Sequence, residues 1–247
     1  MCFFYFSWGL GALKAVILAG GFGKRLRPYT ETIPKPLVEV AGKPILEWQI
    51  EWLKSHGIRD IVLLVGYLKE KIIDYIGSGA RLGVRVSYVV EDQPLGTGGA
   101  LKNAEMVLKN EDYFIVINGD ILTNIDPSKV YEKLFVDDVI GSIASVPLRS
   151  PYGILRIEGD FVKEFTEKPL LEDYWINAGI YAFRPSVFEY LPEKGDIERT
   201  AFPKLAAERK LVAVRFSNVF WRSIDTYKDV EEAGRELIRL KKASEAS

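Results

Sequence analysis

Cysteine and histidine are almost absent from this sequence. Cys2 is the only cysteine and His56 the only histidine among 247 residues. One cysteine excludes a disulfide bond within the chain, and the two residues together cannot form a Cys/His metal cluster. His56 precedes a glycine at an expected helix end, so we interpret it as a polar cap and not as a catalytic base. Low cysteine usage is typical of a reducing compartment, and we therefore expect a cytoplasmic protein.

A strong net charge is also lacking. The chain carries 33 lysines and arginines against 34 aspartates and glutamates, which gives a formal net charge of −1. Such a balance provides no basic field for a nucleic acid or for an anionic membrane surface. We therefore expect no nucleic acid and no membrane among the partners.

The first thirteen residues, MCFFYFSWGLGAL, are strongly apolar. This stretch is too short to span a membrane as a helix, and it lacks the basic start and the cleavage site of a secretory signal. We interpret residues 1–13 as an N-terminal extension of a single domain that covers residues 14–247. Alternatively, they form a hydrophobic patch that docks on the domain or on a partner, which would make them a candidate interface in a homo-oligomer.

What the sequence does contain is a dense cluster of glycines and cations behind the apolar run Lys14–Ala19. The run predicts a buried parallel strand. Three glycines and four cations follow it: Gly20, Gly21, Gly23, Lys24, Arg25, Arg27 and Lys35. A glycine turn exposes backbone N–H groups, and cations beside it complete a site for phosphate. The spacing matches neither G-x-x-x-x-G-K-[ST] nor G-x-G-x-x-G, so it indicates neither a P-loop nor a dinucleotide fingerprint.

Apolar strands and amphipathic helices alternate along the first half of the chain. We expect strands at residues 14–19, 60–66, 84–90 and 113–117, with helices at 44–57 and 68–76. This order predicts a parallel sheet with right-handed crossovers, which binds its ligands at the carboxyl ends of the strands. Further short strands are expected at 139–146, 153–157, 161–165 and 211–216, and further helices at 185–190, 196–208 and 227–242.

The run LAGGFGKRLRP, followed by IPKPLVEVAGKP, closely resembles the signature of the sugar-1-phosphate nucleotidylyltransferases, and most of all their mannose-1-phosphate guanylyltransferase branch. Further matches follow in order: PLGTGGAL at 94–101, NGD at 118–120, EKP at 167–169 and NAG at 177–179. The resemblance implies an α/β fold of the Rossmann-like (GT-A-like) type, with a mainly parallel sheet flanked by helices and a smaller sugar-binding β region. It also implies transfer of a nucleotidyl group from an NTP to a sugar 1-phosphate, with release of pyrophosphate. We find no hexapeptide repeats of the C-terminal β-helix that some members carry.

The same resemblance implies roles for individual residues. Arg25, Lys35 and Asp120 are expected to be catalytic, with Lys35 offsetting charge near the α-phosphate and Asp120 holding Mg²⁺. The residues expected to bind the nucleotide are Leu18, Ala19, Gly20, Gly21, Gly23, Lys24, Arg25, Glu91, Pro94, Gly96 and Thr97. Those expected to bind the sugar phosphate are Gly119, Tyr152, Gly153, Glu167, Lys168, Asn177 and Gly179. Lys24 could also be an ordinary solvated charge.

The second metal ligand is less clear than the first. Ser223 stands where the family most often has an aspartate, and Asp225 follows two residues later. Positions i and i+2 of an extended segment point to the same side, so Asp225 can still reach the metal. We expect Asp120 and Asp225 to be the ligands, and Ser223 remains the alternative to Asp225.

Glu91 bears on the choice of nucleotide. A carboxylate only accepts hydrogen bonds, and guanine presents two donors side by side, whereas uracil and thymine present one donor between two acceptors. This favours GTP, with mannose 1-phosphate or a related manno-sugar. The alternatives are a UTP- or dTTP-dependent glucose-1-phosphate enzyme, and a catalytically silent relative that binds a nucleotide sugar. A third is a GT-A-like glycosyltransferase, which would normally carry D-x-D where this chain has NGD.

Overall fold

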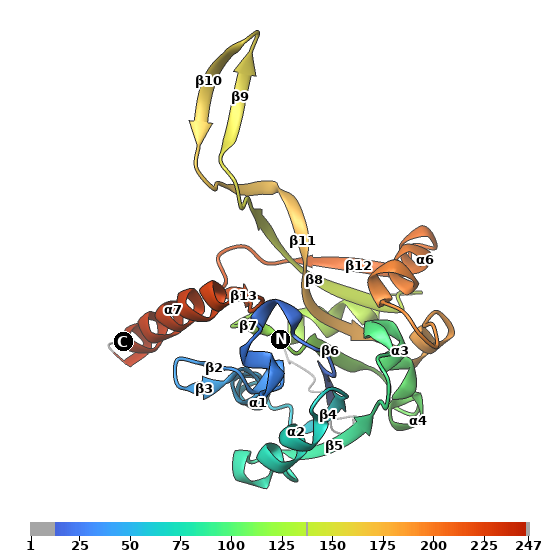
Figure 1. The fold of residues 1–247 in the computed structure, drawn as a ribbon. Coiled ribbons are helices and arrows are strands. Elements are labelled where there is room, and N and C mark those ends of the chain that lie inside the picture. Colours follow the sequence, from blue (N-terminus) through green and yellow to red (C-terminus); the bar gives the residue numbers. More distant parts are fainter. Residues whose placement is uncertain (1–12, 137, 246–247) are drawn as a thin grey trace, which may run out of the picture.

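The computed structural model describes residues 13–136 and 138–245 (Figure 1). Their centre is a seven-stranded sheet in the order β12-β8-β11-β6-β1-β4-β5. Its strands are β1 (Lys14–Ala19), β4 (Asp60–Val65), β5 (Arg85–Val90), β6 (Phe114–Asn118), β8 (Gly141–Arg149), β11 (Leu170–Phe183) and β12 (Leu211–Arg215). Four of the six neighbouring pairs are parallel, and β11 is antiparallel to both β6 and β8. The expected mainly parallel α/β sheet is confirmed.

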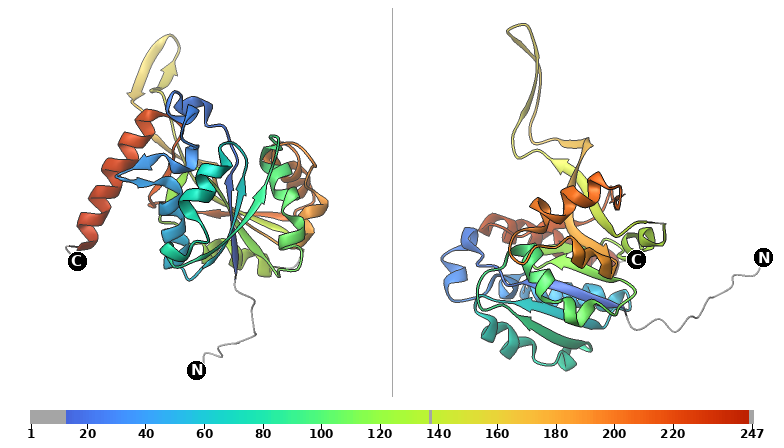
Figure 2. Two further views of the ribbon diagram at one scale, coloured as in Figure 1. Left: turned by 60° about the horizontal axis from the view of Figure 1, so that its bottom comes forward. Right: turned by 90° about the vertical axis from the view of Figure 1, so that its right-hand side faces the viewer.

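Helices pack on both faces of this sheet (Figure 2). They are α1 (Ile45–Ser55), α2 (Lys69–Ile76), α3 (Gly96–Asn103), α4 (Glu105–Leu108), α5 (Ser128–Tyr131) and α6 (Ala201–Ala207). The last helix, α7 (Tyr227–Glu245), packs beside the short strands β2 (Glu39–Val40) and β13 (Trp221–Ser223), outside the main sheet. The helix expected over 196–208 is divided into a 3₁₀ turn, Ile197–Arg199, and α6. Pro203 explains the division, because proline is tolerated only in the first turn of a helix and α6 therefore begins two residues before it.

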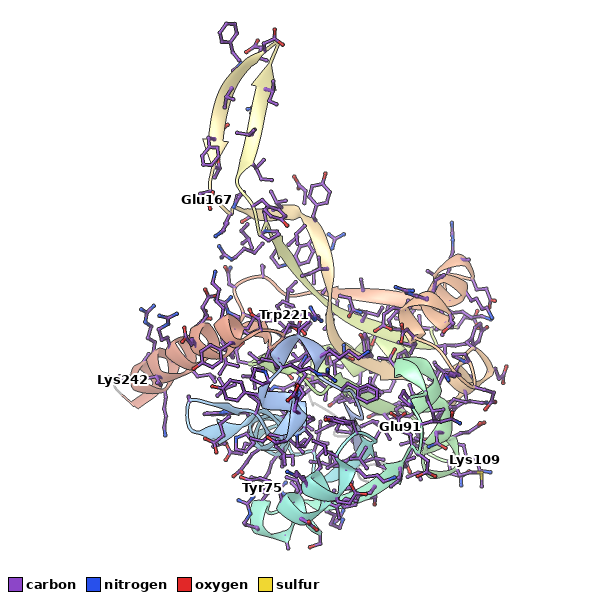
Figure 3. All side chains as sticks on the ribbon, in the orientation of Figure 1. Tyr75, Glu91, Lys109, Glu167, Trp221 and Lys242 are labelled. Atoms are coloured by element: carbon purple, nitrogen blue, oxygen red, sulfur yellow. The ribbon has the colours of Figure 1, made fainter. Side chains whose placement is uncertain are left out.

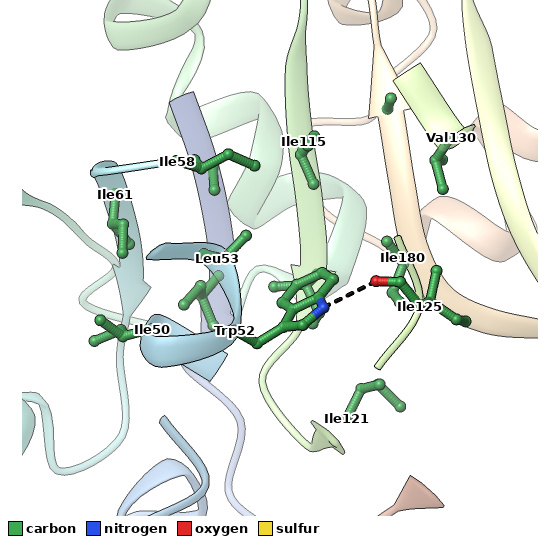
Figure 4. Close-up of a cluster of buried hydrophobic side chains, with 14 of the residues drawn as sticks. Ile50, Trp52, Leu53, Ile58, Ile61, Ile115, Ile121, Ile125, Val130 and Ile180 are labelled. Atoms are coloured by element: carbon green, nitrogen blue, oxygen red, sulfur yellow. Dashed lines mark hydrogen bonds between the residues drawn. The ribbon is translucent and has the colours of Figure 1, made fainter. Parts of the chain in front are cut away.

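The core follows from strands that are apolar on both faces. In β1, Ala15, Ile17 and Ala19 contribute to the cluster beneath α1 and α2, whereas Val16 contributes to the cluster beneath α3, α4 and α6. Figure 4 shows part of the first cluster around Trp52, whose indole N–H donates to the carbonyl of Ile125 at 2.9 Å. Burial on both faces fixes β1 in the interior of the sheet, between β6 and β4.

A third, smaller cluster lies beneath α7. Val230 and Leu237 pack there, and Ala233 is fully buried. Leu240 lies on the same face of the helix but remains 42% exposed. The apolar face expected for the last helix is therefore used along its first turns and left partly open near its end.

Strand β11 was not expected from the sequence. Its first half, LLEDYW, is mixed in character and mostly exposed, and its buried residues begin only at Ala178. A bulge between Leu171 and Trp175 also breaks its pairing with β8. A long strand whose two halves lie in different environments gives no regular alternation, and periodicity therefore misses it.

Three pairs of short strands lie outside the main sheet: β2 (Glu39–Val40) with β3 (Lys43–Pro44), β7 (Ile121–Thr123) with β13 (Trp221–Ser223), and β9 (Ile154–Glu158) with β10 (Phe161–Thr166). The β9–β10 pair, which we call the arm, projects away from the body of the molecule (Figures 1 and 2). It continues from β8 and β11 and corresponds to the smaller β region expected from the sequence.

The N-terminal extension expected at residues 1–13 lies, apart from Leu13, outside the described residues. Leu13 packs against the first core cluster, directly before β1. Within residues 13–136 and 138–245, none of the helices combines the length and the apolar character needed to cross a membrane.

Candidate functional site

A cavity of about 390 Å³ opens at the carboxyl edge of the parallel strands. All eleven residues expected to bind the nucleotide line it: Leu18, Ala19, Gly20, Gly21, Gly23, Lys24, Arg25, Glu91, Pro94, Gly96 and Thr97. Lys35, Gly119, Asp120 and Asp225 line it as well. The structure thus brings residues from five separate segments of the chain to the edge at which ligands of open α/β sheets bind.

The glycine loop after β1 is held in a tight fold. Gly23 has a φ of +60°, and the hydroxyl of Thr30 donates to its carbonyl at 2.8 Å. A Cβ atom on Gly23 would lie 2.9 Å from the Thr30 side chain and 3.0 Å from that of Lys35. Because any larger residue would collide there, the glycine lets the loop close and directs Lys24 and Arg25 toward the cavity.

One ammonium group joins two carboxylates at the floor of the cavity. Lys35 Nζ donates to Asp120 Oδ2 at 2.6 Å and to Asp225 Oδ1 at 2.9 Å. Arg25 Nη2 lies 2.9 Å from the same Asp225 oxygen, and the hydroxyl of Ser223 donates to Asp225 Oδ2 at 3.0 Å. Burial pushes the pKa of Asp225 up, but the contacts with these partners outweigh burial and hold it below its ordinary value. Asp225 is therefore an anion at neutral pH.

The pairing of β7 with β13 explains why the two aspartates meet. Asp120 directly precedes β7, and Asp225 lies just beyond β13. The two strands pair with Ile121 opposite Ser223, and the backbone N–H of Ile224 donates to the carbonyl of Asp120 at 2.9 Å. The side chain of Ile224 is fully buried beneath α7. This anchoring fixes Asp225 beside Asp120.

Glu91 follows β5 and points into the cavity from the opposite wall. Cβ atoms on Gly20 and on Gly66 would each lie 2.6 Å from Glu91 Oε1, so both glycines leave room for its carboxylate. Burial raises the pKa of Glu91, and a 3.3 Å hydrogen bond from the backbone N–H of Leu95 acts in the opposite direction. Glu91 is thus a partly buried acceptor that packs against the backbone at the ends of two strands.

Six cavity residues were missed by the sequence analysis: Phe22, Pro36, Leu64, Ala100, Asn118 and Asp196. Asn118 lies within the NGD motif, so that motif could have revealed it. Asp196 comes from a loop that the sequence gives no reason to connect with Thr97. The loop is held there because the backbone N–H of Ile197 donates to Thr97 Oγ1 at 2.9 Å, and because Gly98 N–H donates to the carbonyl of Gly195.

The residues expected to bind the sugar phosphate are divided between two places. Gly119 lines the cavity. Gly179 lies next to it, because a Cβ atom on Gly179 would lie 2.9 Å from the amide of the cavity residue Asn118. Asn177 is held beside Gly179, whose backbone N–H donates to Asn177 Oδ1 at 2.8 Å.

The remaining four, Tyr152, Gly153, Glu167 and Lys168, lie at the base of the arm and do not line the cavity. Figure 3 shows the separation, with Glu91 in the body and Glu167 at the foot of the arm. Tyr152 is 76% exposed, and Lys168 contacts Glu167 at 3.6 Å. The structure therefore assembles the expected nucleotide half of the site and leaves these four residues apart from it.

No group of three or more histidine, cysteine, aspartate or glutamate side chains among the described residues is arranged to hold a metal ion. The cavity instead offers the two carboxylates of Asp120 and Asp225. Magnesium is commonly bound by one or two carboxylates together with substrate phosphates, so this pair is of the appropriate kind.

Comparisons with known proteins agree with this geometry. Residues 14–239 match the family model described as nucleotidyl transferase. The chain is 37% identical over 226 residues to the mannose-1-phosphate guanylyltransferase catalytic subunit beta of Danio rerio, and 36% identical over 225 residues to the mannose-1-phosphate guanyltransferase of Yarrowia lipolytica. Each alignment covers 88% of this chain and 62% of the relative, so the chain spans less than two thirds of these proteins.

Solved structures are similar over most of their length. HddC from Yersinia pseudotuberculosis, complexed with GMP-PN, aligns with a TM-score of 0.72 and 32% identity, covering 91% of this chain and 99% of HddC. A Bacillus anthracis chain classed as a glucose-1-phosphate thymidylyltransferase, in complex with a sucrose, aligns with a TM-score of 0.73 and 26% identity, covering 91% of this chain and 94% of that chain.

Proposed function

The chain belongs to the nucleotidyl transferase family, and we propose that it transfers a guanylyl group from GTP to mannose 1-phosphate or a related manno-sugar 1-phosphate, releasing pyrophosphate. The observation that carries this proposal is the cluster of Lys35, Asp120 and Asp225 beside a glycine loop at the carboxyl edge of the sheet. The names of the relatives from Danio rerio and Yarrowia lipolytica support the choice of GTP and of mannose 1-phosphate.

The nucleotide would bind along the wall from the glycine loop to Glu91. Backbone N–H groups of the loop and the guanidinium of Arg25 would hold the triphosphate. Glu91 would accept the two adjacent donors of guanine, and a partly buried carboxylate makes such hydrogen bonds strong. HddC, a chain of similar fold, was solved in complex with the guanine nucleotide GMP-PN, which supports the same assignment here.

Asp120 and Asp225 fit a divalent cation, and we assign Mg²⁺ to them. Their carboxylates already share one cationic group, the ammonium of Lys35. When bound, Mg²⁺ would neutralise phosphate charge and orient the reacting phosphates. Ser223 donates to Asp225, which supports Asp225 as the ligand and Ser223 as the group that orients it.

The reaction needs no general base, because the phosphate of the sugar substrate is ionised at neutral pH. One of its oxygens attacks the α-phosphorus of GTP, and the bond from that phosphorus to the bridging oxygen breaks as pyrophosphate leaves. Lys35 would offset the negative charge that develops at the α-phosphate. By the family resemblance, Lys168 would hold the phosphate of the sugar, with Asn177 and Gly179 facing the sugar itself; in this structure Lys168 lies at the base of the arm, outside the cavity. The chain would therefore act through positioning and charge neutralisation.

A thymidylyl- or uridylyltransferase acting on glucose 1-phosphate is the second candidate, favoured by the Bacillus anthracis chain of similar fold. A catalytically silent relative is disfavoured by the intact cluster of Lys35, Asp120 and Asp225. The single-domain organisation, the cytoplasmic location and the absence of nucleic-acid partners remain predictions from the sequence.

Pyrophosphate release in the presence of Mg²⁺ tests the proposal. GTP, UTP, dTTP, CTP and ATP would each be combined with mannose 1-phosphate and with glucose 1-phosphate, with Lys35→Ala as the control for contaminating activity. We expect release with GTP and mannose 1-phosphate, and little with the Lys35→Ala variant. Release only with UTP or dTTP would replace the proposed nucleotide, and release with none of the pairs, also when manno-heptose 1-phosphate is added to the panel, would contradict the proposed reaction.

A further inference from the structure

One buried residue of α1 does not fit the apolar face of that helix. Ile45, Leu46, Ile50 and Leu53 are fully buried, at the spacing of a helix face that packs on a sheet. Gln49 lies on the same face and is 2% exposed. A buried amide costs free energy unless it is hydrogen-bonded, so the reason for a glutamine at this position must lie in its partners.

The amide of Gln49 bridges the turn that carries Asp120. Its nitrogen Nε2 donates to the carbonyl of Asn118 at 2.8 Å and to the carbonyl of Ile121 at 2.9 Å. Asn118 is the last residue of β6 and Ile121 is the first residue of β7. The two bonds therefore join the strand ends on either side of Gly119 and Asp120. Carbonyl oxygens only accept hydrogen bonds, which fixes the direction of the amide.

The oxygen of the same amide is left unpaired. Gln49 Oε1 is buried and has no hydrogen-bond partner among residues 13–136 and 138–245. An unpaired buried acceptor lowers the stability of the folded state by an amount similar to what two ordinary hydrogen bonds contribute. A side chain that only filled the core here would be apolar. Gln49 is therefore not explained by the stability that it adds.

Backbone contacts hold the rest of the turn. The N–H of Gly119 donates to the carbonyl of Leu18 at 3.0 Å, and the carbonyl of Asp120 accepts from the N–H of Ile224 at 2.9 Å. A Cβ atom on Gly119 would collide with the carbonyl of Leu18, so the turn approaches β1 as closely as a backbone can. Together with the two bonds from the glutamine amide, these contacts hold each of residues 118–121 through its backbone.

We propose that Gln49 is a positioning residue of the transfer reaction. It holds the turn so that the carboxylate of Asp120 meets Lys35 and, together with Asp225, faces the divalent cation. This inference rests on the proposed function. It extends the functional site to α1, none of whose residues lines the nucleotide cavity.

Removing the amide would release the turn. The carbonyl oxygens of Asn118 and Ile121 both point at one nitrogen, and without a donor between them their partial negative charges repel. Asp120 lies between these two residues in the chain, so its carboxylate would leave the position 2.6 Å from Lys35 Nζ. A small displacement of a charged group at the reacting centre lowers the rate while the chain remains folded.

Trp52 provides a matched control on the same helix. It lies one turn after Gln49, is 9% exposed, and donates from its indole N–H to the carbonyl of Ile125 at 2.9 Å. Gln49→Met and Trp52→Phe each remove a buried donor that bonds the same stretch of backbone, but only Gln49→Met does so next to Asp120. Methionine is unbranched and adaptable, so it can fill the space of the glutamine. Gln49→Leu repeats the test with a second apolar side chain, in case the methionine variant does not fold.

Hydrogen exchange followed by NMR measures the turn without any ligand. The amides of Gly119 and Ile224 report on it, because each donates one of the bonds that hold the turn. We expect Gln49→Met to accelerate exchange of these two amides by about ten-fold or more and to leave those of α1 within about three-fold. Trp52→Phe should leave Gly119 and Ile224 within about three-fold. Unchanged exchange at both amides would overturn the proposal, as would equal acceleration throughout α1 and β6, which would make Gln49 an ordinary packing residue.

Kinetics separate positioning from binding. Gln49→Met should lower kcat by about 30-fold or more and leave KM for GTP within about three-fold, because the nucleotide wall of the cavity is untouched. Trp52→Phe should leave kcat within about three-fold. A fall in kcat of the same size in both variants would show that α1 acts on the rate only through general packing, and the proposal would fail.

Titration calorimetry of GTP with and without Mg²⁺ tests the same point without turnover. The factor by which Mg²⁺ tightens GTP binding should fall about five-fold or more in Gln49→Met, because Asp120 no longer faces the cation, and stay within about two-fold in Trp52→Phe. An unchanged factor in Gln49→Met would contradict the link to the cation. If exchange changes as expected but the wild-type chain turns over no substrate pair, the role of Gln49 in holding Asp120 stands and the proposed function fails.

Discussion

At the scale of single residues, the ionised carboxylate of Glu91 lowers the stability of the folded chain but suits a ligand with hydrogen-bond donors. Burial raises its pKa above the ordinary 4.5 of a glutamate. The folded state therefore prefers the protonated carboxyl, and the stability that this side chain contributes below pH 4.5 is lost as the pH rises through the raised pKa. At neutral pH the buried anion opposes folding. A ligand with hydrogen-bond donors at this position would relieve that penalty.

Replacing Glu91 by glutamine separates the two effects. We expect Glu91→Gln to be at least as stable as the wild-type chain at pH 7, since the buried charge is gone. Its kcat/KM for GTP should fall about 10- to 100-fold, because a charged hydrogen bond to guanine contributes ~1.5–3 kcal/mol. Asp92→Asn is the matched control, since Asp92 is the next residue and its side chain is 93% exposed. An equal loss with UTP would contradict a role in base recognition.

The choice between Asp225 and Ser223 as metal ligand is a second question at this scale. Asp225 receives hydrogen bonds from Lys35 and from Ser223, so its carboxylate is aligned with the cluster. We expect Asp225→Asn to lower kcat by about 100-fold or more, as when a group that stabilises transition-state charge is lost. Ser223→Ala should lower it by less than about 10-fold, as for a group that only orients a ligand. Kinetics at varied Mg²⁺ would measure both, and a larger effect of Ser223→Ala would make Ser223 the ligand.

At the scale of elements, the loop after β1 is tied to α7. The rings of Tyr29 and Tyr227 stack with centroids 5.6 Å apart and an interplanar angle of 17°. Arg25 contacts Asp225 just before the helix. The loop would hold phosphates and the start of α7 follows Asp225, so the stack connects the two sides of the cavity.

Removing either ring should loosen the loop. We expect Tyr29→Ala and Tyr227→Ala each to raise KM for GTP about 2- to 10-fold, since an aromatic pair contributes ~0.5–1.5 kcal/mol. The double variant should lose little more than either single one, because both remove the same contact. Tyr75→Ala on α2 is a suitable control, since Tyr75 hydrogen-bonds to Glu47 away from the cavity. Fully additive effects would indicate that the two rings act separately.

Which strands and which cavity residues could be predicted from the sequence depended on the element that carries them. The apolar runs of β1, β4 and β6 predicted three parallel strands, because burial on both faces leaves an unbroken apolar pattern. The edge strand β5, of which no residue is buried, was predicted from its valines and tyrosine. The nucleotide half of the cavity was predictable for a related reason: its residues follow those strands within short motifs. Asp196 and β11 were not, since Asp196 reaches the cavity only through tertiary hydrogen bonds near Thr97. The four residues at the base of the arm follow a motif in sequence, but their distance from the cavity depends on the direction of the arm.

At the scale of the whole molecule, residues that line the cavity belong to, or adjoin in sequence, all three hydrophobic clusters. Ala19 belongs to the cluster under α1 and α2, Leu101 of α3 belongs to the cluster on the opposite face, and Ile224 belongs to the cluster beneath α7. Cavity residues precede or follow each of them: Gly20, Ala100 and Asp225. A nucleotide bound there would contact members of the first two clusters, such as Ala19 and Leu64, and would reach the third only through Asp225, which follows Ile224.

Nucleotide binding should therefore raise the stability of the body as a unit. A ligand that binds only the folded state stabilises it by ~2.7 kcal/mol at 100 times its Kd, which for a chain of this size corresponds to a rise in Tm of about 5–10 °C. We expect such a rise with GTP and Mg²⁺, measured by scanning calorimetry, and a smaller one with UTP at the same concentration. The rise with GTP should shrink in Glu91→Gln and persist in Asp92→Asn, because only Glu91 faces the cavity. Equal rises with GTP and UTP would contradict the role of Glu91, and no rise with any nucleotide would contradict the assignment of the cavity.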